Sequence, residues 1–479
     1  MARDWREDRI DELERENAAL RAGICEQQAL IEAQKRTIAV LERRVQELEA
    51  RLGQHSGNSS RPPSTDPPGR PPPARPTRTG RKRGGQPGHD KHDRALVPPE
   101  KVTRTHVLKP QACGCCGKAL HGEDPEPDRH QVAEIPKVVA DVDEYQIHTL
   151  TCDDCGASTR ASLPAGVPTG QFGPRLQAIV ALSSGAYKMS KREIEQMVVD
   201  FFGVPISLGS IANLEQATSE AIAVPVAEVA QAIQKQPVVH ADETGWYERS
   251  KRAWLWGAIA STMALFLIRA SRGAKVAKEL LGAAFAGILV SDRWSGYAWV
   301  DTARRQLCWA HLLRQFRGFQ DHGPDAQRVG SSLELLTDVM FRAWHRVRDG
   351  TMTRASFRKL MESLRPHVVA WLREGASSAI PAVAGRCREI LELEPALWTF
   401  VFVEGVEPTN NAAERILRPG VLWRKRSFGT DSPNGSRFVE RILTVVTTLR
   451  LQKRNVLDYV TAACQAAISG QPAPSLLPT

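Results

Sequence analysis

The chain has 479 residues, of which 42% are hydrophobic and 25% charged, and its net charge is +10. This is the composition of an ordinary globular protein, and the length predicts two to four domains. No stretch approaches 18 consecutive apolar residues and the first residues, MARDWRE, are polar, which excludes a membrane span or a secretory signal and indicates a cytoplasmic protein. The positive charge indicates a polyanionic partner.

Residues 1–53 are predicted to form a parallel coiled coil. β-Branched residues at position a and leucine at position d of a heptad repeat favour two parallel strands. Position a holds Ile10, Asn17, Ile24, Ile31, Ile38, Val45 and Leu52, and position d holds Leu13, Leu20, Gln27, Gln34, Leu41 and Leu48. The alternative is a lone amphipathic helix that lies on the rest of the protein. The strict register favours a homodimer or a higher oligomer.

Residues 54–105 are predicted to be a disordered linker, rich in proline and in basic residues. Residues 61–94 alone hold nine Lys/Arg and three Asp, a net charge of +6. The basic run Arg81, Lys82 and Arg83 could lie along a DNA backbone. Composition favours this role no more than that of a solubilising spacer.

Residues 106–160 carry two CxxC pairs. The cysteines are Cys113, Cys116, Cys152 and Cys155. In a reducing cytoplasm, such pairs are typical of a closed, structural four-thiolate Zn²⁺ site. In the segment 132–150 between them, apolar and polar residues alternate enough to form the strands of a zinc ribbon. Four incidental cysteines are the alternative, and Cys115 makes the first pair ambiguous by one position.

Residues 161–236 are predicted to be helical. Ser190 and Glu193 form a capping box that opens a helix over 191–202, and Ser207 starts a second helix. Two helices joined by a glycine-containing turn are typical of a DNA-binding helix-turn-helix. An ordinary helical hairpin explains the same pattern equally well.

Residues 237–319 contain four continuous apolar runs that predict buried strands, with a helix before the last of them. The strands cover 238–242, 254–261, 264–269 and 288–292, and the helix covers 274–285. The first and fourth strands end in Asp242 and Asp292. Three strands, a helix and a fourth strand fit the ribonuclease-H-like order, in which the first and fourth strands lie side by side. Two carboxylates that converge there repel each other and need a cation such as Mg²⁺ (or Mn²⁺).

A third acid for such a site is found in the stretch PTNNAAER, at 408–415. Glu414 lies in the first turn of a helix predicted there, where it could bind the metal. A capping role is equally consistent, with Asn411 as the N-cap and an ion pair from Glu414 to Arg418. The rivals on spacing alone are Glu404 and Glu407.

A basic strip follows Glu414, with Trp423 inside it. Its members are Arg415, Arg418, Arg424, Lys425 and Arg426. Beside three acids, such a strip suits a phosphodiester backbone and stacked or unpaired bases. The alternative is a solvated helix face.

Several of these stretches resemble the DDE transposases of the insertion-sequence-66 family. They are NSSRPPS (58–64), GQPGH (85–89), HADET (240–244), SDRWSGY (291–297), CWAH (308–311) and TNNAAER (409–415). The resemblance covers nearly the whole chain and implies a bacterial, nucleoid-associated enzyme that binds element ends and target DNA, with or without accessory proteins of the element. It also implies that Asp242, Asp292 and Glu414 are the catalytic Mg²⁺ ligands, and that 320–400 is a helical insertion within the catalytic core.

Cys308 and His311 form a C-x2-H pattern that resembles one in several DDE transposase groups. It indicates a role near the metals or the DNA, although a core cysteine and a hydrogen-bonded histidine explain it slightly better. His240 shares a strand face with Asp242 and is a further accessory candidate.

The sequence therefore predicts a multidomain α+β protein with a coiled coil, a zinc ribbon, a helix-turn-helix-like helical domain and a ribonuclease-H-like catalytic core. The core comprises 237–319 and 401–460, and 461–479 are expected to form a C-terminal tail. The predicted function is Mg²⁺-dependent DNA cleavage and strand transfer at the ends of an insertion sequence. The first alternative is a nuclease or resolvase of the same fold that only hydrolyses, and the second is a non-catalytic, dimeric zinc DNA-binding regulator.

Overall fold

The computed structural model describes residues 5–55, 57–58 and 95–478. Most of the predicted linker, with Arg81, Lys82 and Arg83, lies outside the described residues. The described chain contains helices, a mixed five-stranded sheet and a short two-stranded one, which confirms the predicted α+β class. In this described part, no helix is long and apolar enough to cross a membrane.

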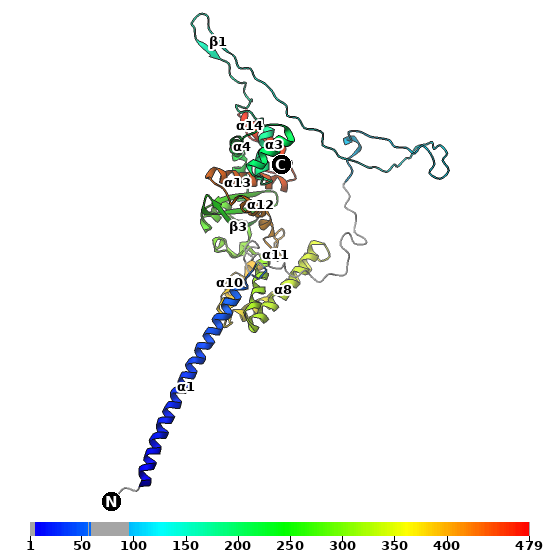
Figure 1. Cartoon of the computed structure of the whole chain (residues 1–479). Helices are drawn as coiled ribbons and strands as arrows, with labels where there is room; N and C mark the ends of the chain where they lie inside the picture. Colours follow the sequence, from blue (N-terminus) through cyan, green and yellow to red (C-terminus); the bar gives the residue numbers. More distant parts are fainter. Residues whose placement is uncertain (1–4, 56, 59–94, 479) are drawn as a thin grey trace.

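The heptad segment is one uninterrupted helix, α1 (Trp5–Leu52). It projects away from the body of the protein, with the N-terminus at its far end (Figure 1). Its apolar stripe is open to solvent, with Ile24 53% and Ile31 49% exposed. At its base, the Asn58 side-chain amide donates to the Asp321 carboxylate at 2.7 Å. The alternative of a helix that lies on the rest of the protein is therefore wrong, while a coiled-coil partner stays a prediction.

The cysteine-rich segment is extended and carries little regular structure. A short antiparallel pair, β1 (Thr149–Thr151) with β2 (Ser158–Arg160), follows a single 3-10 turn, η2 (Pro99–Lys101). The strands expected over 132–150 are limited to β1. The alternating side chains before it have nothing to pack against, and Val132 is 81% exposed. Alternation without a buried face does not produce a sheet.

The helical region follows the predicted boundaries closely. Its helices are α2 (Pro174–Gly185), α3 (Lys191–Phe202), α4 (Leu208–Ala221) and α5 (Ala223–Ile233). The capping box at the start of α3 is confirmed, because the Ser190 hydroxyl accepts from the Glu193 N–H and the Ser190 N–H donates to the Glu193 carboxylate. Ser207 caps α4 as predicted.

The central sheet has the strand order β5-β4-β3-β6-β7. The strands are β3 (Val238–Glu248), β4 (Lys251–Ile259), β5 (Ala264–Arg269), β6 (Ile288–Ser291) and β7 (Arg305–Leu307). β4 pairs antiparallel with both β3 and β5, whereas β6 pairs in parallel with both β3 and β7. The predicted adjacency of the first and fourth strands, β3 and β6, is therefore confirmed.

Three predicted elements in the sheet region have other bounds in the structure. The strand predicted over 254–261 is β4, which begins at Lys251 and ends at Ile259. β3 does not end at Asp242 but continues to Glu248, because its second half forms a hairpin with β4 that buries Trp246. Helix α6 (Ala274–Leu281) ends before 285 because Gly282, with φ of +85°, leaves the helical conformation. The longer β3 places Asp242 in the middle of a strand.

Helix α13 (Pro433–Leu451) protects the free edge of β5. Three alternate backbone N–H groups of β5, at Ala264, Phe266 and Ile268, donate to side chains that lie one helical turn apart. The acceptors are Thr448, Thr444 and Glu440, at 3.1, 3.1 and 2.5 Å. Two residues of a strand and four of a helix advance about 6–7 Å each, so the two ladders stay in step. An edge strand without such cover invites pairing with another chain.

The segment between the sheet and the last helices is helical and has a core of its own. It begins with α7 (Trp309–Phe319) and continues through η5 (Gln320–His322), α8 (Pro324–Arg348), α9 (Arg354–Ala376), α10 (Pro381–Glu392), η6 (Glu394–Leu397) and α11 (Thr399–Phe402). Its aromatic centre packs Trp344, Phe357 and Phe400 at centroid distances of 5.4–5.8 Å.

Short 3-10 helices η3 (Ser295–Tyr297) and η4 (Thr302–Arg304) join β6 to β7.

The expected C-terminal tail is part of the core. Helix α14 (Val456–Ile468) runs through its first half, and Leu476 beyond it is fully buried. The Tyr459 hydroxyl donates to the carbonyl of Pro474 at 2.7 Å. Apolar residues near the chain end thus pack against the core, a contact that the sequence alone does not reveal.

Helix α12 (Asn411–Ser427) packs tightly on β4 at Gly420. A Cβ at this position would overlap the Leu255 side chain. We expect Gly420→Ala to lower the free energy of unfolding by about 1–3 kcal/mol, the cost of overpacking. The matched control is Gly385→Ala on α10, where a Cβ meets nothing within 4 Å and helix propensity gains up to about 1 kcal/mol. Urea denaturation measures both, and a gain for Gly420→Ala would contradict the close approach.

Candidate active site

A cavity of about 840 Å³ lies at the middle of the sheet, and the three sequence-predicted acids line it. Asp242 comes from β3, Asp292 follows β6, and Glu414 stands in the first turn of α12. The parallel register pairs His240 with Val290. Asp242 and Asp292 each lie two residues further, so both carboxyl groups stand at the same level of neighbouring strands.

The carboxyl groups in the cavity interact electrostatically with one another. Burial raises the pKa of Asp242 well above its usual range, and the charges of Glu243, Asp292 and Glu414 raise it further. Burial also raises the pKa of Asp292 and of Glu414, while nearby arginines oppose the shift at both. The site therefore holds more negative charge than it can stabilise alone.

The capping interpretation of Glu414 is wrong. The N-cap of α12 is Asn410 rather than Asn411, and no side chain caps the helix. Glu414 instead directs its carboxylate toward α7, at 3.6 Å from His311 Nδ1 and 3.8 Å from the Arg314 guanidinium, and Arg418 is not its ion-pair partner in the described chain. Its Oε1 atom is buried and has no hydrogen-bond partner. The carboxylate is thus left available to a ligand in the cavity.

The two rival acids lie elsewhere. Glu404 is exposed before α12, and Glu407 accepts a hydrogen bond from the Trp344 indole at 3.3 Å. Neither lines the cavity.

Asn410 joins three elements of the site, a role that the sequence analysis missed. Its side-chain amide donates to the carbonyl of Ala241 on β3 at 2.8 Å. Its backbone N–H donates to Cys308 Sγ at 3.1 Å. The fully buried Asn410 thereby holds the start of α12 against the strand of Asp242 and the start of α7. The sequence offered one signal: two asparagines stand at the helix start, and a helix needs only one of them as its N-cap.

Glu243, a second buried acid beside Asp242, was also missed. Its side chain is fully buried, pairs with Arg272 at 2.7 Å and accepts a hydrogen bond from the Tyr297 hydroxyl at 2.7 Å. Burial raises the pKa of Glu243, and the Arg272 charge opposes that rise. The Arg272 guanidinium in turn stacks between Trp294, at 3.9 Å, and Trp254, at 4.8 Å. Glu243, Arg272 and the two tryptophans thus form part of the cavity wall next to the two aspartates.

The basic strip lies on α12, and only part of it faces the cavity. Arg418 and Arg424 line the cavity, and Arg424 also donates to the carbonyl of Gly245. Arg426 pairs with Glu193 of α3 at 2.5 Å, whereas Arg415 and Lys425 are exposed. Trp423 is half-buried, with its ring 6.3 Å from that of Phe438. It packs against the core from its partly buried position.

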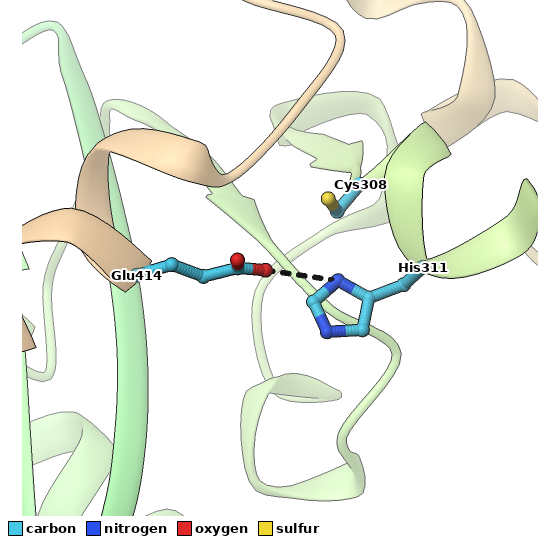
Figure 2. A group of neighbouring side chains, drawn as sticks. All are labelled: Cys308, His311 and Glu414. Atoms are coloured by element: carbon cyan, nitrogen blue, oxygen red, sulfur yellow. Dashed lines mark ion pairs between the residues drawn. The ribbon is translucent and has the colours of Figure 1, made fainter. Parts of the chain in front are cut away.

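Cys308 and His311 lie beside Glu414 (Figure 2). The ligand atoms of these three side chains fall within 4.8 Å of one another. Cys308 is buried at the start of α7, and His311 Nδ1 is buried without a hydrogen-bond partner. The interpretation of His311 as a hydrogen-bonded core histidine is therefore wrong for this atom, and both residues line the cavity.

His240 does not line the cavity. Burial lowers its pKa to about 4, and the Asn410 side chain partly opposes this shift. The Asn410 contact places His240 next to the N-terminus of α12.

The two CxxC pairs form two separate turns. The N–H of Gly117 donates to the carbonyl of Cys113, and the N–H of Gly156 donates to that of Cys152, both at 2.9 Å. Within the described residues, Cys308, His311 and Glu414 are the one group of three or more candidate metal ligands, so the structure does not bring the four thiols together. The shared Zn²⁺ site stays a prediction.

Residues 169–437, more than half of the chain, match the Transposase IS66 family. The chain belongs to the IS66 family of transposases. The IS66 match contains all three acids, Asn410 and the C-x2-H pair, and it begins after the second CxxC pair. Residues 2–95 match a separate family of unknown function (DUF6444).

Two curated relatives of this IS66-family chain come from Sinorhizobium fredii. The uncharacterized protein y4qI is 28% identical over 251 residues, which cover 47% of this chain and 46% of that protein. The uncharacterized protein y4hP is 25% identical over 404 residues, which cover 74% of this chain and 70% of that protein. The chain thus spans about half the length of the first relative, and neither relative has an assigned reaction.

Proposed function

We propose that the protein is a DDE transposase that cleaves DNA at the ends of an insertion sequence and joins the ends to target DNA. The observation that carries the proposal is the meeting of Asp242, Asp292 and Glu414, from three separate elements, at one cavity where burial raises the pKa of each. Membership of the IS66 family supports the proposal.

A ribonuclease-H-like core is part of this proposal. Three antiparallel strands followed by two parallel ones, with one acid on the first strand and another directly after the fourth, support it. The helical segment 320–400 would then be an insertion that leaves the sheet intact.

The three carboxylates fit a Mg²⁺ (or Mn²⁺) site. Their donor atoms are all oxygens, which hard cations prefer. Their mutual repulsion and the unpartnered Oε1 of Glu414 are both relieved by a bound cation. Mg²⁺ bound there would supply activation of the attacking oxygen and stabilisation of the leaving oxygen.

The residues around the acids are suited to a phosphodiester. Arg418 and Arg424 line the same cavity and can bind the phosphates on either side of the scissile bond. In the first step, a water oxygen bonds to phosphorus and the bond to the 3′-oxygen breaks, which leaves a 3′-hydroxyl. In the second step, that hydroxyl bonds to a target phosphorus and one target phosphodiester bond breaks. Each step exchanges one P–O bond for another and needs no covalent protein intermediate.

The remaining modules have proposed roles around this core. A coiled-coil dimer through α1 would bring two active sites to the two ends of the element. The CxxC pairs would bind a structural Zn²⁺, and the basic run near 81–83 would hold DNA. The stretch from α2 to α5 is a candidate for DNA recognition.

Protons and Mg²⁺ are expected to compete for the three acids. Because their pKa values are raised in the folded state, the carboxyl groups keep their protons to higher pH than in the unfolded chain. At a pH below the raised pKa values the carboxyl groups are protonated and offer Mg²⁺ no charged site. At a pH above these values the carboxylates repel one another, and bound Mg²⁺ relieves that repulsion. We expect the rise in melting temperature on adding excess Mg²⁺ to be clearly larger at pH 8 than at pH 5. Equal rises at both pH values would contradict a shared carboxylate site.

The proposal is tested on the DNA that flanks the gene. Footprinting of the full-length protein is expected to show a protected inverted repeat, and incubation with Mg²⁺ to release 3′-hydroxyl ends there. Pre-cleaved ends are expected to join to a target plasmid. Cleavage without joining would support a hydrolytic nuclease instead, and protection without any nicking would support a non-catalytic regulator.

A further inference from the structure

Three ligand atoms of different chemistry meet at the side of the cavity nearest α7. Cys308 immediately precedes α7, and His311 follows one helical turn later, so both face the same side of the helix. Glu414 reaches them from α12, and the ligand atoms lie within 4.8 Å of one another (Figure 2). The residues come from two elements more than a hundred residues apart in the chain.

Two atoms of this group lack any hydrogen bond. His311 Nδ1 and Glu414 Oε1 are both buried and unpartnered, and they stand 3.6 Å apart, too far for a hydrogen bond between them. Buried polar atoms nearly always have a partner, so a pair of orphans that face each other indicates a missing ligand. A cation between them would satisfy both atoms at once.

The geometry favours a metal ion over a proton as that cation. A proton on His311 Nδ1 would not form a hydrogen bond to Glu414 Oε1 across 3.6 Å. A Zn²⁺ ion binds imidazole nitrogen and carboxylate oxygen at about 2.0–2.2 Å each, so it fits between two atoms at this separation.

Cys308 supplies the soft ligand. Its Sγ is buried beside the other two ligand atoms, and a metal ion that binds it displaces the thiol proton. The Asn410 N–H already donates to Sγ at 3.1 Å, and the sulfur stands at the N-terminus of α7. Both features stabilise a thiolate.

We propose that Cys308, His311 and Glu414 form a Zn²⁺ site, with a fourth position open to water or phosphate. Thiolate, imidazole and carboxylate together suit Zn²⁺ and not Mg²⁺, which selects oxygen ligands. The site is distinct from the CxxC pairs, and it shares Glu414 with the carboxylate cluster.

The shared ligand gives Zn²⁺ control over the proposed reaction, and this part rests on the proposed function. The Glu414 carboxylate already points toward α7, and a Zn²⁺ ion bound there would keep it from joining Asp242 and Asp292 around Mg²⁺. Zn²⁺ is therefore expected to inhibit Mg²⁺-dependent cleavage, and the inhibition should depend on Cys308.

Binding is tested with Co²⁺, a coloured substitute for Zn²⁺, on the full-length protein. The variants are Cys308→Ser and a matched control, Cys464→Ser, which alters another buried thiol that lies 3.8 Å from the Thr218 hydroxyl. We expect Cys308→Ser to lose one equivalent of bound Co²⁺ and the corresponding thiolate-to-cobalt absorption, and Cys464→Ser to lose neither. His311→Gln is the second variant if Cys308→Ser melts early. Unchanged Co²⁺ stoichiometry and absorption in both site variants would overturn the proposal.

Inhibition is tested separately by Zn²⁺ titration of cleavage, with each variant compared with its own zinc-free rate. The Zn²⁺ concentration that halves the rate is expected to rise at least about tenfold in Cys308→Ser. Even the loss of a residue that only hydrogen-bonds to a metal ligand lowers metal affinity by about 10–100-fold. An unchanged value would overturn the inhibitory role. If no cleavage occurs at all but the Co²⁺ equivalent is lost, the Zn²⁺ site stands and the proposed function fails.

Discussion

Replacement of Asp242 by asparagine is expected to abolish DNA cleavage and, at the same time, to stabilise the metal-free protein. Burial, and after it the charges of the neighbouring carboxylates, raise the pKa of Asp242 well above its usual range. Asparagine keeps the shape of the side chain but removes a charge that Mg²⁺ requires. Loss of a metal ligand is worth several kcal/mol of transition-state stabilisation, so the cleavage rate should fall at least about 10³-fold.

The same substitution removes a buried carboxylate that the neighbouring acids repel. Without Mg²⁺, we expect the melting temperature to rise by about 2 °C or more, the shift that about 1 kcal/mol produces in a domain of this size. Mg²⁺ should then add little further stability. A purely structural aspartate would give the opposite result, because its replacement would lower the melting temperature.

The measurements are nicking of end-containing DNA and thermal unfolding with and without Mg²⁺. Asp338→Asn, an exposed acid on α8, is the matched control and should change neither. DNA binding by Asp242→Asn should persist, because the basic residues are untouched. Wild-type cleavage by Asp242→Asn would remove the acid from the proposed mechanism.

Two glutamates placed on the apolar stripe of α1 are expected to dissociate the proposed dimer. Ile24 and Ile31 are successive a positions and are 53% and 49% exposed in the single chain. Burial of an isoleucine contributes about 1.5–3 kcal/mol. Ile24→Glu with Ile31→Glu removes four such side chains from a dimer interface, so its Kd should rise at least about 10³-fold.

Sedimentation at micromolar protein concentration measures this effect. The control carries the same added charge on the outer face of the helix, as Ala29→Glu with Ala33→Glu, and should remain dimeric. The stripe variant should still nick single ends but should lose concerted joining of two ends. If wild type and stripe variant sediment alike as monomers, the coiled-coil proposal is wrong.

Local patterns were enough to predict most of the elements. The capping box at Ser190, the continuous helix over 5–52 and the strand over 264–269 depend on neighbouring residues, and the structure has them at the predicted positions. The pairing of β3 with β6 was also predictable, because parallel strands joined by a helix have few topologies available. Boundaries failed where a distant partner decides them, as at β3, whose second half exists through its hairpin with β4.

By itself, the sequence determined the residue types of the site: two acids at the levels of neighbouring strands, a third acid at a helix start, and a C-x2-H pair on one helical turn. Only the tertiary structure decided what Glu414 does. Its carboxylate faces His311 and not its own helix because Asn410 ties α12 to β3 and to Cys308. That choice rests on contacts between residues about 100 to 170 positions apart. Local propensity carries no information about them, since they form only when the whole core is packed.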